Sequence, residues 1–315
     1  MTAPLLPKDV PQPVVGIIGG SGLYSGSSAL QTITTIQREE LHTPFGLPSS
    51  AITISKTSNG TIVAFLARHG LAHSFTPSYV PVRANLSALK LVGCEAIITF
   101  SAVGSLQEDL RPGEFVLPDH VIDRTFARTE ESTIFGNDMV GHVPMAEPFS
   151  KHLRSLLQQA AKQSVPQLTI HTEKTVITIE GPRFSTRAES HLYRQWKCDV
   201  INMSACPEVF IARELELPYQ MVCMVTDYDC WKEDEEGVSV DKVMSVMRGN
   251  GDMAAQLMVA IVDLVGREHA TSGPIWMGMR KEVEGAAKYA VMTKLDARSP
   301  AMKERLRLLL PQYHA

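Results

Sequence analysis

The chain has 315 residues, of which 44% are hydrophobic and 20% are charged, and its formal net charge is −4. This composition is typical of a soluble globular protein, and the length is enough for one large α/β domain. The slightly acidic balance and the lack of a polybasic block argue against nucleic acid or an anionic membrane as a partner, and no apolar run is long enough to span a bilayer.

The N-terminal residues and the cysteines bear on where the protein works. Residues 1–13 contain four prolines and lack the basic and apolar regions of a signal peptide, so we expect an extended lead-in. The five cysteines include no Cys-x-x-Cys pair, and their odd number favours reduced thiols in an intracellular protein over disulfides or a zinc site. We expect a cytoplasmic protein, with the nucleus as a second compartment.

Strand-like and helix-like segments alternate along the chain. Expected strands cover residues 14–18, 51–56, 61–66, 96–100, 114–121, 175–179, 200–203 and 219–226, and expected helices cover 80–92, 150–163, 186–196, 207–215, 238–265 and 301–310. This alternation predicts one α/β domain with a central mixed sheet flanked by helices. We assign residues 14–268 to that domain and residues 269–315 to a C-terminal extension of unknown role.

Two details of the helices and loops bear on function. Ser185 is a natural N-cap for the helix expected to begin at residue 186. Residues 123–141 lack clear periodicity and are expected to form a long loop, which in compact domains often carries function.

Small and polar residues follow several of the expected strands. Residues 19–22 read Gly-Gly-Ser-Gly and suit a turn whose backbone N–H groups approach an anion. These glycines also nearly fit a dinucleotide fingerprint, with acids at Glu39 and Glu40, but Ser25 replaces its third glycine, so a turn that binds nothing is favoured over the fingerprint. Arg68 ends another strand and can offer phosphate a bidentate fork, and a third small-residue turn is expected at 101–105.

Two acids, Asp227 and Asp229, lie at the end of the expected strand 219–226. Ligands of open parallel sheets bind beyond the carboxyl ends of the strands, and this spacing lets both side chains project from one side. The pair suits general acid chemistry, metal binding or recognition of a donor-rich ligand edge. The alternative is a structural one, in which the acids form a turn before the acidic start of a helix. This stretch alone does not favour the functional or the structural interpretation.

Six motifs in unbroken order give the chain a family resemblance. They are Gly19-Gly20-Ser21-Gly22-Leu23, Arg68-His69-Gly70, Ser101-Ala102-Val103-Gly104-Ser105, Glu180-Gly181-Pro182-Arg183-Phe184-Ser185, Val200-Ile201-Asn202-Met203-Ser204 and Thr226-Asp227-Tyr228-Asp229-Cys230-Trp231. Together they resemble the S-methyl-5′-thioadenosine phosphorylases, a branch of the trimeric purine nucleoside phosphorylases, over roughly residues 14 to 268.

The resemblance implies phosphorolysis, in purine and methionine salvage. Phosphate attacks the anomeric carbon of methylthioadenosine, and the products are adenine and 5-methylthioribose 1-phosphate. No metal or organic cofactor is implied, because inorganic phosphate is the co-substrate. The matching motifs imply one set of phosphate-binding residues, which comprises Ser21, Arg68, His69, Ser101, Ala102 and Ser204. The implied catalytic residues are Asp227, Ser204 and His69.

The resemblance also assigns residues to the nucleoside. A protonated Asp227 would donate to N7 of the leaving adenine, while its other oxygen or Asp229 accepts from the 6-amino group, which requires a raised pKa at Asp227. Ser185 would add a polar contact to the base. The residues implied to line the sugar, base and methylthio positions are Met203, Phe184, Val240, Val243 and Met244. His142 matches a residue that reaches in from a neighbouring subunit, so the resemblance implies a homotrimer.

Three rival interpretations accompany this one. Relatives that act on 6-oxopurines carry asparagine where Asp227 stands, because an amide can donate to O6, so a phosphorylase for inosine or guanosine is the nearest rival. A dinucleotide-binding oxidoreductase built on Gly20-x-Gly22 is less favoured. A nucleoside-binding protein without catalytic activity is the third. Without the resemblance, His142 would be interpreted as a loop histidine.

Overall fold

The structure is a computed structural model, and it describes residues 5–20, 30–128, 131–233 and 239–314. Ser21, one of the implied phosphate-binding residues, lies outside the described residues, as do Gly22 and Leu23 of the same motif. Along the described part of the chain, no helix is both long and apolar enough to cross a bilayer.

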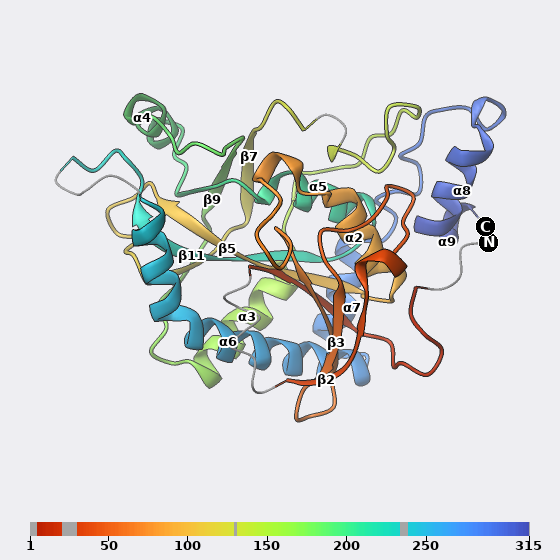
Figure 1. The fold of residues 1–315 in the computed structure, drawn as a ribbon, viewed down its shortest axis with the longest axis horizontal. Coiled ribbons are helices and arrows are strands. Elements are labelled where there is room, and N and C mark those ends of the chain that lie inside the picture. Colours follow the sequence, from red (N-terminus) through yellow and green to blue (C-terminus); the bar gives the residue numbers. More distant parts are fainter. Residues whose placement is uncertain (1–4, 21–29, 129–130, 234–238, 315) are drawn as a thin grey trace.

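A mixed β-sheet forms the centre of the molecule, with helices on both sides of it (Figure 1). Its strands are β1 (Val15–Gly19), β2 (Gln31–Ile36), β3 (Ile52–Lys56), β4 (Ile62–Ala67), β5 (Ala96–Ser105), β6 (Phe115–Leu117), β7 (His120–Arg124), β8 (Ile170–Thr172), β9 (Thr175–Ile179), β10 (Val200–Asn202) and β11 (Tyr219–Tyr228). The main path is β2-β3-β4-β1-β5-β10-β9-β7, and β11, β6 and β8 branch from β5. The predicted α/β domain with a central mixed sheet is confirmed.

Strand β5 joins the parts of this sheet. Its first half pairs in parallel with β1, and nearly its whole length pairs in parallel with β11. Its last two residues pair antiparallel with β10. The ends of β1, β5, β10 and β11 therefore meet in one region, where the polar residues of the motifs gather.

The helices form two layers around the sheet. On one side lie α2 (Val82–Leu91) and α5 (Ala205–Glu214), and on the other lie α3 (Lys151–Ser164), α6 (Val240–Ala270) and α7 (Pro274–Val283) (Figure 1). The remaining helices are α4 (Arg187–Gln195), α8 (Pro300–Leu309) and α9 (Pro311–His314), with short 3₁₀ turns η1 (Arg38–Glu40), η2 (Pro77–Tyr79) and η4 (Leu295–Ala297).

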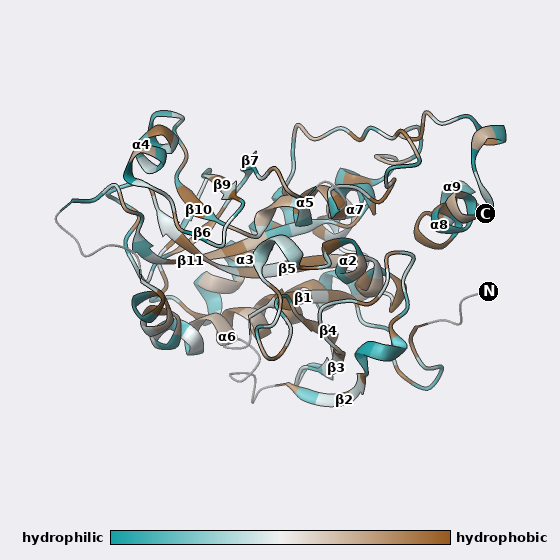
Figure 2. Ribbon diagram, turned by 45° about the horizontal axis from the view of Figure 1, so that its top comes forward, coloured by the Kyte–Doolittle hydropathy of each residue, from teal (hydrophilic) through white to brown (hydrophobic). Residues whose placement is uncertain are grey.

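Hydrophobic patterning explains this layering. Every residue of β1 is buried, as expected for a parallel strand covered on both faces. In α3 the buried residues Leu153, Leu156, Leu157 and Ala160 recur at three- and four-residue spacing, which gives the helix one apolar face. Figure 2 shows the hydrophobic colouring concentrated on the central strands between the helix layers.

Several predicted boundaries were wrong. The expected turn at 101–105 is the second half of β5, and β11 continues through Tyr228, so these polar side chains stand on strands. The expected strand 114–121 is two strands, β6 and β7, and the strands β2 and β8 and helix α7 were missed. The N-cap of α4 is Thr186, not Ser185: Thr186 and Glu189 form the capping box.

The C-terminal residues are tied to the body of the protein through Glu216. Its carboxylate accepts hydrogen bonds from the Ala287 backbone N–H at 2.8 Å, from the Tyr313 hydroxyl at 3.0 Å and from Gln312 Nε2 at 3.1 Å. Helix α6 itself runs past the predicted boundary at 268, to Ala270. The division of the chain into residues 1–13, 14–268 and 269–315 stays a prediction.

Candidate active site

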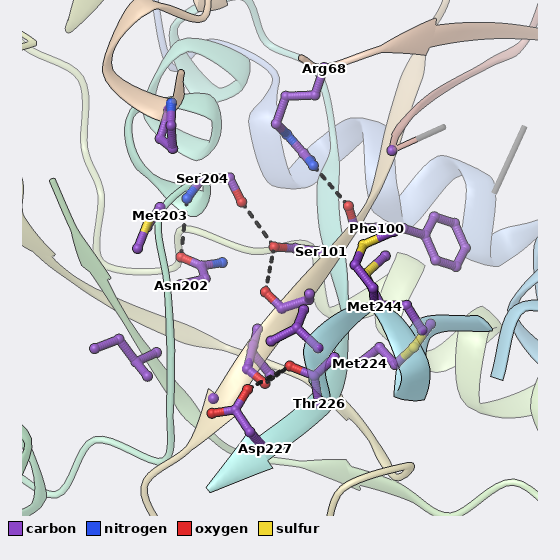
Figure 3. A pocket seen from close by; sticks show the side chains of 18 of the residues that line it. Arg68, Phe100, Ser101, Asn202, Met203, Ser204, Met224, Thr226, Asp227 and Met244 are labelled. Carbon is purple, nitrogen blue, oxygen red and sulfur yellow. Dashed lines mark hydrogen bonds between the residues drawn. The ribbon is translucent and has the colours of Figure 1, made fainter. Parts of the chain in front are cut away.

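A cavity of about 600 Å³ opens where β1, β4, β5, β10 and β11 end or run past one another, and α6 forms its outer wall. Figure 3 shows Arg68, Ser101 and Ser204 at one end of it and Thr226 and Asp227 toward the other. The residues implied by the resemblance that line it are Arg68, His69, Ser101, Ala102, Met203, Ser204, Phe184, Ser185, Asp227, Asp229, Val243 and Met244.

Arg68 follows β4 and is buried at the end of the cavity that Ser101 and Ser204 also line. We call this the anion end, because its side chains are hydrogen-bond donors. Its Nε and Nη2 donate to the two oxygens of Glu208 at 2.5 and 3.2 Å, and its Nη1 donates to the Phe100 carbonyl oxygen at 2.9 Å. Glu208 also accepts from the Tyr219 hydroxyl at 2.9 Å. Because a guanidinium has five N–H donors, two remain for an anion in the cavity.

His69 lies beside Arg68 at the same end. Its Nδ1 is 2.9 Å from the Phe75 carbonyl oxygen, which makes Nδ1 the protonated nitrogen and leaves Nε2 free to act as an acceptor in the neutral ring. Burial lowers the pKa of His69, and the positive charge of Arg68 lowers it further. A neutral imidazole is therefore favoured at neutral pH.

Two hydroxyls meet between β5 and the turn after β10. Ser101 Oγ and Ser204 Oγ are 2.9 Å apart, and Ser101 Oγ also lies 3.0 Å from the Ala102 carbonyl oxygen (Figure 3). Each hydroxyl can rotate its single proton toward another acceptor. Together with the terminal N–H groups of Arg68, they form a set of donors that suits a phosphate oxygen.

A β-bulge shapes the other end of the cavity. The register of β11 against β5 shifts between Val225 and Asp227, which places Thr226 at the irregularity. Thr226 Oγ1 lies 2.7 Å from Asp227 Oδ2 and 3.2 Å from the Val103 carbonyl oxygen. Gly104 makes room for the acid, because a Cβ there would stand 3.1 Å from Asp227 Oδ1.

Asp229 lies two residues further along, with its backbone fixed to the end of β5. Its N–H donates to the Ser105 carbonyl oxygen at 3.0 Å, and Trp231 Nε1 donates to the same oxygen at 2.8 Å. Burial raises the pKa of Asp229, and the nearby hydroxyls of Ser190 and Ser185 counter it in part. Since Thr186 caps α4, the Ser185 side chain is available to the cavity.

Apolar side chains line the space between the two ends. Val243, Met244 and Met247 present one face of α6 to the cavity, and Met203 and Met224 lie on the sheet side. Val240 and His142 do not line the cavity of their own chain. Val240 is the first residue of α6 and is exposed, and His142 is exposed with its backbone N–H bonded to the Ala290 carbonyl oxygen at 3.0 Å.

Glu208, Thr226 and Met224 belong to this site but were not predicted. Glu208 lies 140 residues from Arg68 in sequence, so no local pattern joins the two. Thr226 stands beside Asp227 and could have been noticed as a hydroxyl at a strand end. Within the described residues, no group of three or more histidine, cysteine or acidic side chains is placed to hold a metal ion.

Comparison with known proteins assigns the chain to one class of protein. A profile of the phosphorylase superfamily matches residues 14–263. The chain belongs to that superfamily and, within it, to the S-methyl-5′-thioadenosine phosphorylase family. An S-methyl-5′-thioadenosine phosphorylase of Puccinia graminis f. sp. tritici is 43% identical over 307 residues, which are 96% of this chain and 98% of the relative.

Solved structures agree with this assignment. A methylthioadenosine phosphorylase from an antarctic soil metagenomic library has 40% sequence identity and a TM-score of 0.84, covering 95% of this chain and 99% of that one. A methylthioadenosine phosphorylase from Schistosoma mansoni, solved in complex with adenine, has 37% identity and a TM-score of 0.77, covering 87% of this chain and 99% of that one. Family membership favours the phosphorylase interpretation over dinucleotide binding.

Proposed function

We propose that the protein is an S-methyl-5′-thioadenosine phosphorylase, a pentosyltransferase that converts methylthioadenosine and phosphate into adenine and 5-methylthioribose 1-phosphate. The observation that carries this proposal is a cavity with anion donors at one end and two buried carboxyl groups at the other. In this reaction negative charge grows on the leaving base while the sugar becomes cationic, so a nucleophile must be held on one side and the base neutralised on the other.

Phosphate is proposed to bind at the anion end. Arg68 contributes its two remaining N–H donors, and Ser101 and Ser204 contribute hydroxyls. The Ala102 backbone and His69 line the same end. Ser21 completes the proposed set from the family resemblance. Ser204 and His69 are also proposed as catalytic residues, because they line the cavity where the attacking phosphate is proposed to bind.

Asp227 is proposed to protonate or hold N7 of the leaving adenine. The Thr226 hydroxyl has one proton for two acceptors, Asp227 Oδ2 and the Val103 carbonyl oxygen. Thr226 thus holds the Asp227 carboxyl at the end of the cavity opposite Ser101 and Ser204, where a protonated Asp227 is proposed to donate to N7. Asp229, whose pKa burial raises, is proposed to accept from the 6-amino group.

The apolar residues are proposed to bind the rest of the substrate. Met203 would pack against the sugar and Phe184 against the base, with Ser185 at the base edge. Val243 and Met244 offer an apolar surface that suits a methylthio group better than a hydroxyl. Val240 stands at the rim of this surface, beyond the cavity lining.

We infer that the active unit is an oligomer, a homotrimer by family resemblance, in which His142 serves the cavity of a neighbouring subunit. Two groups of exposed apolar side chains support this inference. One, near the cavity mouth, comprises Leu71, Tyr79 and Phe126; the other, near His142, comprises Val140, Tyr289, Met292 and Leu295. Pairing of two different surfaces is a head-to-tail contact, and such contacts form a ring when the rotation between subunits closes, as a trimer requires.

The test of the function is adenine release from methylthioadenosine, followed with and without phosphate. Phosphate-dependent release, with 5-methylthioribose 1-phosphate as the second product, is expected, whereas phosphate-independent release would indicate a hydrolase. Arg68→Ala is expected to raise the KM for phosphate and lower kcat.

The test of the shared site is complementation. His142→Ala and Asp227→Asn subunits are each expected to be weakly active, and mixed oligomers are expected to regain activity because some cavities then combine an intact Asp227 with an intact His142. No gain on mixing would contradict a shared site.

A further inference from the structure

Arg128 is a buried cation in the loop after β7, and it does not line the cavity. It uses four of its five N–H donors. Nε donates to Glu180 Oε1 at 3.1 Å, and Nη2 donates to the carbonyl oxygens of Glu180 and Met203 at 2.9 and 3.0 Å. Nη1 donates to the Cys206 carbonyl oxygen at 2.7 Å. Three of these four acceptors are backbone carbonyl oxygens, those of Glu180, Met203 and Cys206.

The carbonyls of Met203 and Cys206 stand on either side of Ser204. The turn of residues 203–206, whose last two residues begin α5, is also held from its N–H side, because Asn202 Oδ1 accepts from the N–H groups of Ser204 and Ala205 at 3.4 and 3.3 Å (Figure 3). Arg128 therefore binds the carbonyl oxygens of this turn, and the Asn202 side chain binds its N–H groups. Held this way, the Ser204 hydroxyl meets Ser101 at 2.9 Å.

Glu180 anchors Arg128 to the surrounding wall. Its carboxylate accepts from the backbone N–H groups of Phe126 and Ala127 at 2.7 and 2.9 Å, and from the Ser78 hydroxyl at 2.5 Å. Burial alone would raise the pKa of Glu180, but these hydrogen bonds and the one from Arg128 lower it to about 2. The carboxylate therefore stays charged at neutral pH, and the position of Arg128 does not depend on pH there.

We propose that Arg128 is a positioning residue for phosphate: it fixes the turn of residues 203–206 and thereby aims the Ser204 hydroxyl into the anion end of the cavity. The inference rests on the proposed function, because that function assigns Ser204 to phosphate. A planar guanidinium can reach carbonyls on separate segments from its three nitrogens, whereas the three N–H donors of a lysine ammonium all stand on one nitrogen. Three of the four bonds go to backbone carbonyls, so they fix the relative positions of the segments that carry residues 180, 203 and 206.

Kinetics of Arg128→Lys and Arg128→Ala test this proposal against a general loss of structure. Both variants are expected to raise the KM for phosphate by about tenfold or more. The reason is that a small displacement of the Ser204 hydroxyl would weaken its hydrogen bond to phosphate in an ordered site. The inhibition constant of adenine is expected to stay within about twofold of the wild type, because Thr226 holds the Asp227 carboxyl and the Ser105 carbonyl oxygen holds the Asp229 backbone, at the end of the cavity away from Ser204. Added guanidinium ion is expected to lower the phosphate KM of Arg128→Ala.

Two further variants complete the test. Arg83→Ala removes a cation that pairs with Glu131 at 3.5 Å, and it is expected to leave both constants unchanged. Glu180→Gln, which keeps the residue-180 carbonyl but loses the negative charge, is expected to raise the phosphate KM less than Arg128→Ala does. If Arg128→Ala fails to fold, Arg128→Lys and Glu180→Gln decide the question.

The outcomes separate this proposal from the function on which it rests. An unchanged phosphate KM in folded variants, or equal losses of phosphate and adenine binding, would overturn the role of Arg128. Phosphate-independent adenine release by the wild type would instead overturn the proposed function.

Discussion

The guanidinium of Arg68 is held edge-on by the carboxylate of Glu208, with Nε–Oε1 at 2.5 Å and Nη2–Oε2 at 3.2 Å. Both side chains are almost completely buried, and Tyr219 donates a further hydrogen bond to Glu208. The proposed phosphate-binding cation is thus already paired and oriented by the protein. The fork that faces Glu208 is not the one offered to phosphate, which must use the remaining N–H groups of Arg68.

Glu208→Gln is expected to weaken both folding and phosphate binding. Removal of one charge from a buried pair leaves the other uncompensated, which costs about 3–5 kcal/mol. Urea denaturation is expected to show that loss, and steady-state kinetics a higher KM for phosphate. Glu304→Gln is the matched control, because Glu304 pairs with Arg307 on the exposed face of α8, where solvent screens the pair and its effect on stability is small. Equal stability losses in the two variants would contradict a special role for Glu208.

The sequence predicted the parts of the site that local patterns carry. Arg68, Asp227 and Asp229 stand after or at the end of hydrophobic β-prone runs, so their common location at the sheet could be predicted. Glu208 and Thr226 act through contacts with groups 140 and 123 residues away, and such contacts leave no periodic signal.

Other errors have similarly specific causes. Ser185 and Thr186 are both good N-cap residues, and only the capping box with Glu189 distinguishes them. Small residues at 101–105 resemble a turn, yet pairing with β11 keeps them in β5. Arg128 lies in a loop without periodicity, so its four hydrogen bonds could not be predicted.

Gly104→Ala is expected to impair catalysis because of the close approach of Asp227. The added Cβ would stand 3.1 Å from both Asp227 Oδ1 and Ile201 Cγ2, so the acid must move. We expect kcat to fall by about tenfold or more, as for other small displacements of reacting groups. Gly249→Ala on α6 is the control, since its Cβ would meet nothing within 4 Å; it is expected to stabilise the helix by up to about 1 kcal/mol. Unchanged kcat in Gly104→Ala would contradict the proposed position of the acid.

Glu214 is expected to make folding depend on pH. Burial raises the pKa of its carboxyl from 4.5 to about 7, although hydrogen bonds from Ile134 and Thr133 oppose the shift. Between these two pH values the folded state keeps a proton that the unfolded state has lost, so stability falls as pH rises through this window. The loss attributable to Glu214 is at most about 3 kcal/mol.

Urea denaturation of the wild type and Glu214→Gln at pH 5 and pH 8 measures that dependence. The wild type is expected to lose more stability between these pH values than the variant, which has no proton to release at this position. A pH dependence of the same size in both proteins would exclude Glu214 as its source.

Arg305 on α8 is expected to influence the substrate through the loop that carries His142. Its Nη1 donates to the Phe135 carbonyl oxygen at 2.9 Å and pairs with Asp138 at 2.9 Å. Loss of both contacts in Arg305→Met is expected to raise the KM for methylthioadenosine by roughly threefold to tenfold. This is the effect expected when hydrogen bonds that hold the His142 loop in place are lost. Arg307→Met, two residues along α8, removes only an exposed pair with Glu304 and is expected to leave KM unchanged. Equal KM values in the two variants would exclude a role for Arg305 in substrate binding.

The central claim is that Asp227 donates a proton to N7, and that a carboxyl group rather than an amide at this position selects a 6-aminopurine leaving group. The measurement that tests it most directly is kcat/KM for methylthioadenosine and for methylthioinosine, in the wild type and in Asp227→Asn. The wild type is expected to prefer methylthioadenosine, and the variant is expected to shift toward methylthioinosine because an amide can donate to O6. An unchanged ratio in the variant would contradict the role assigned to Asp227.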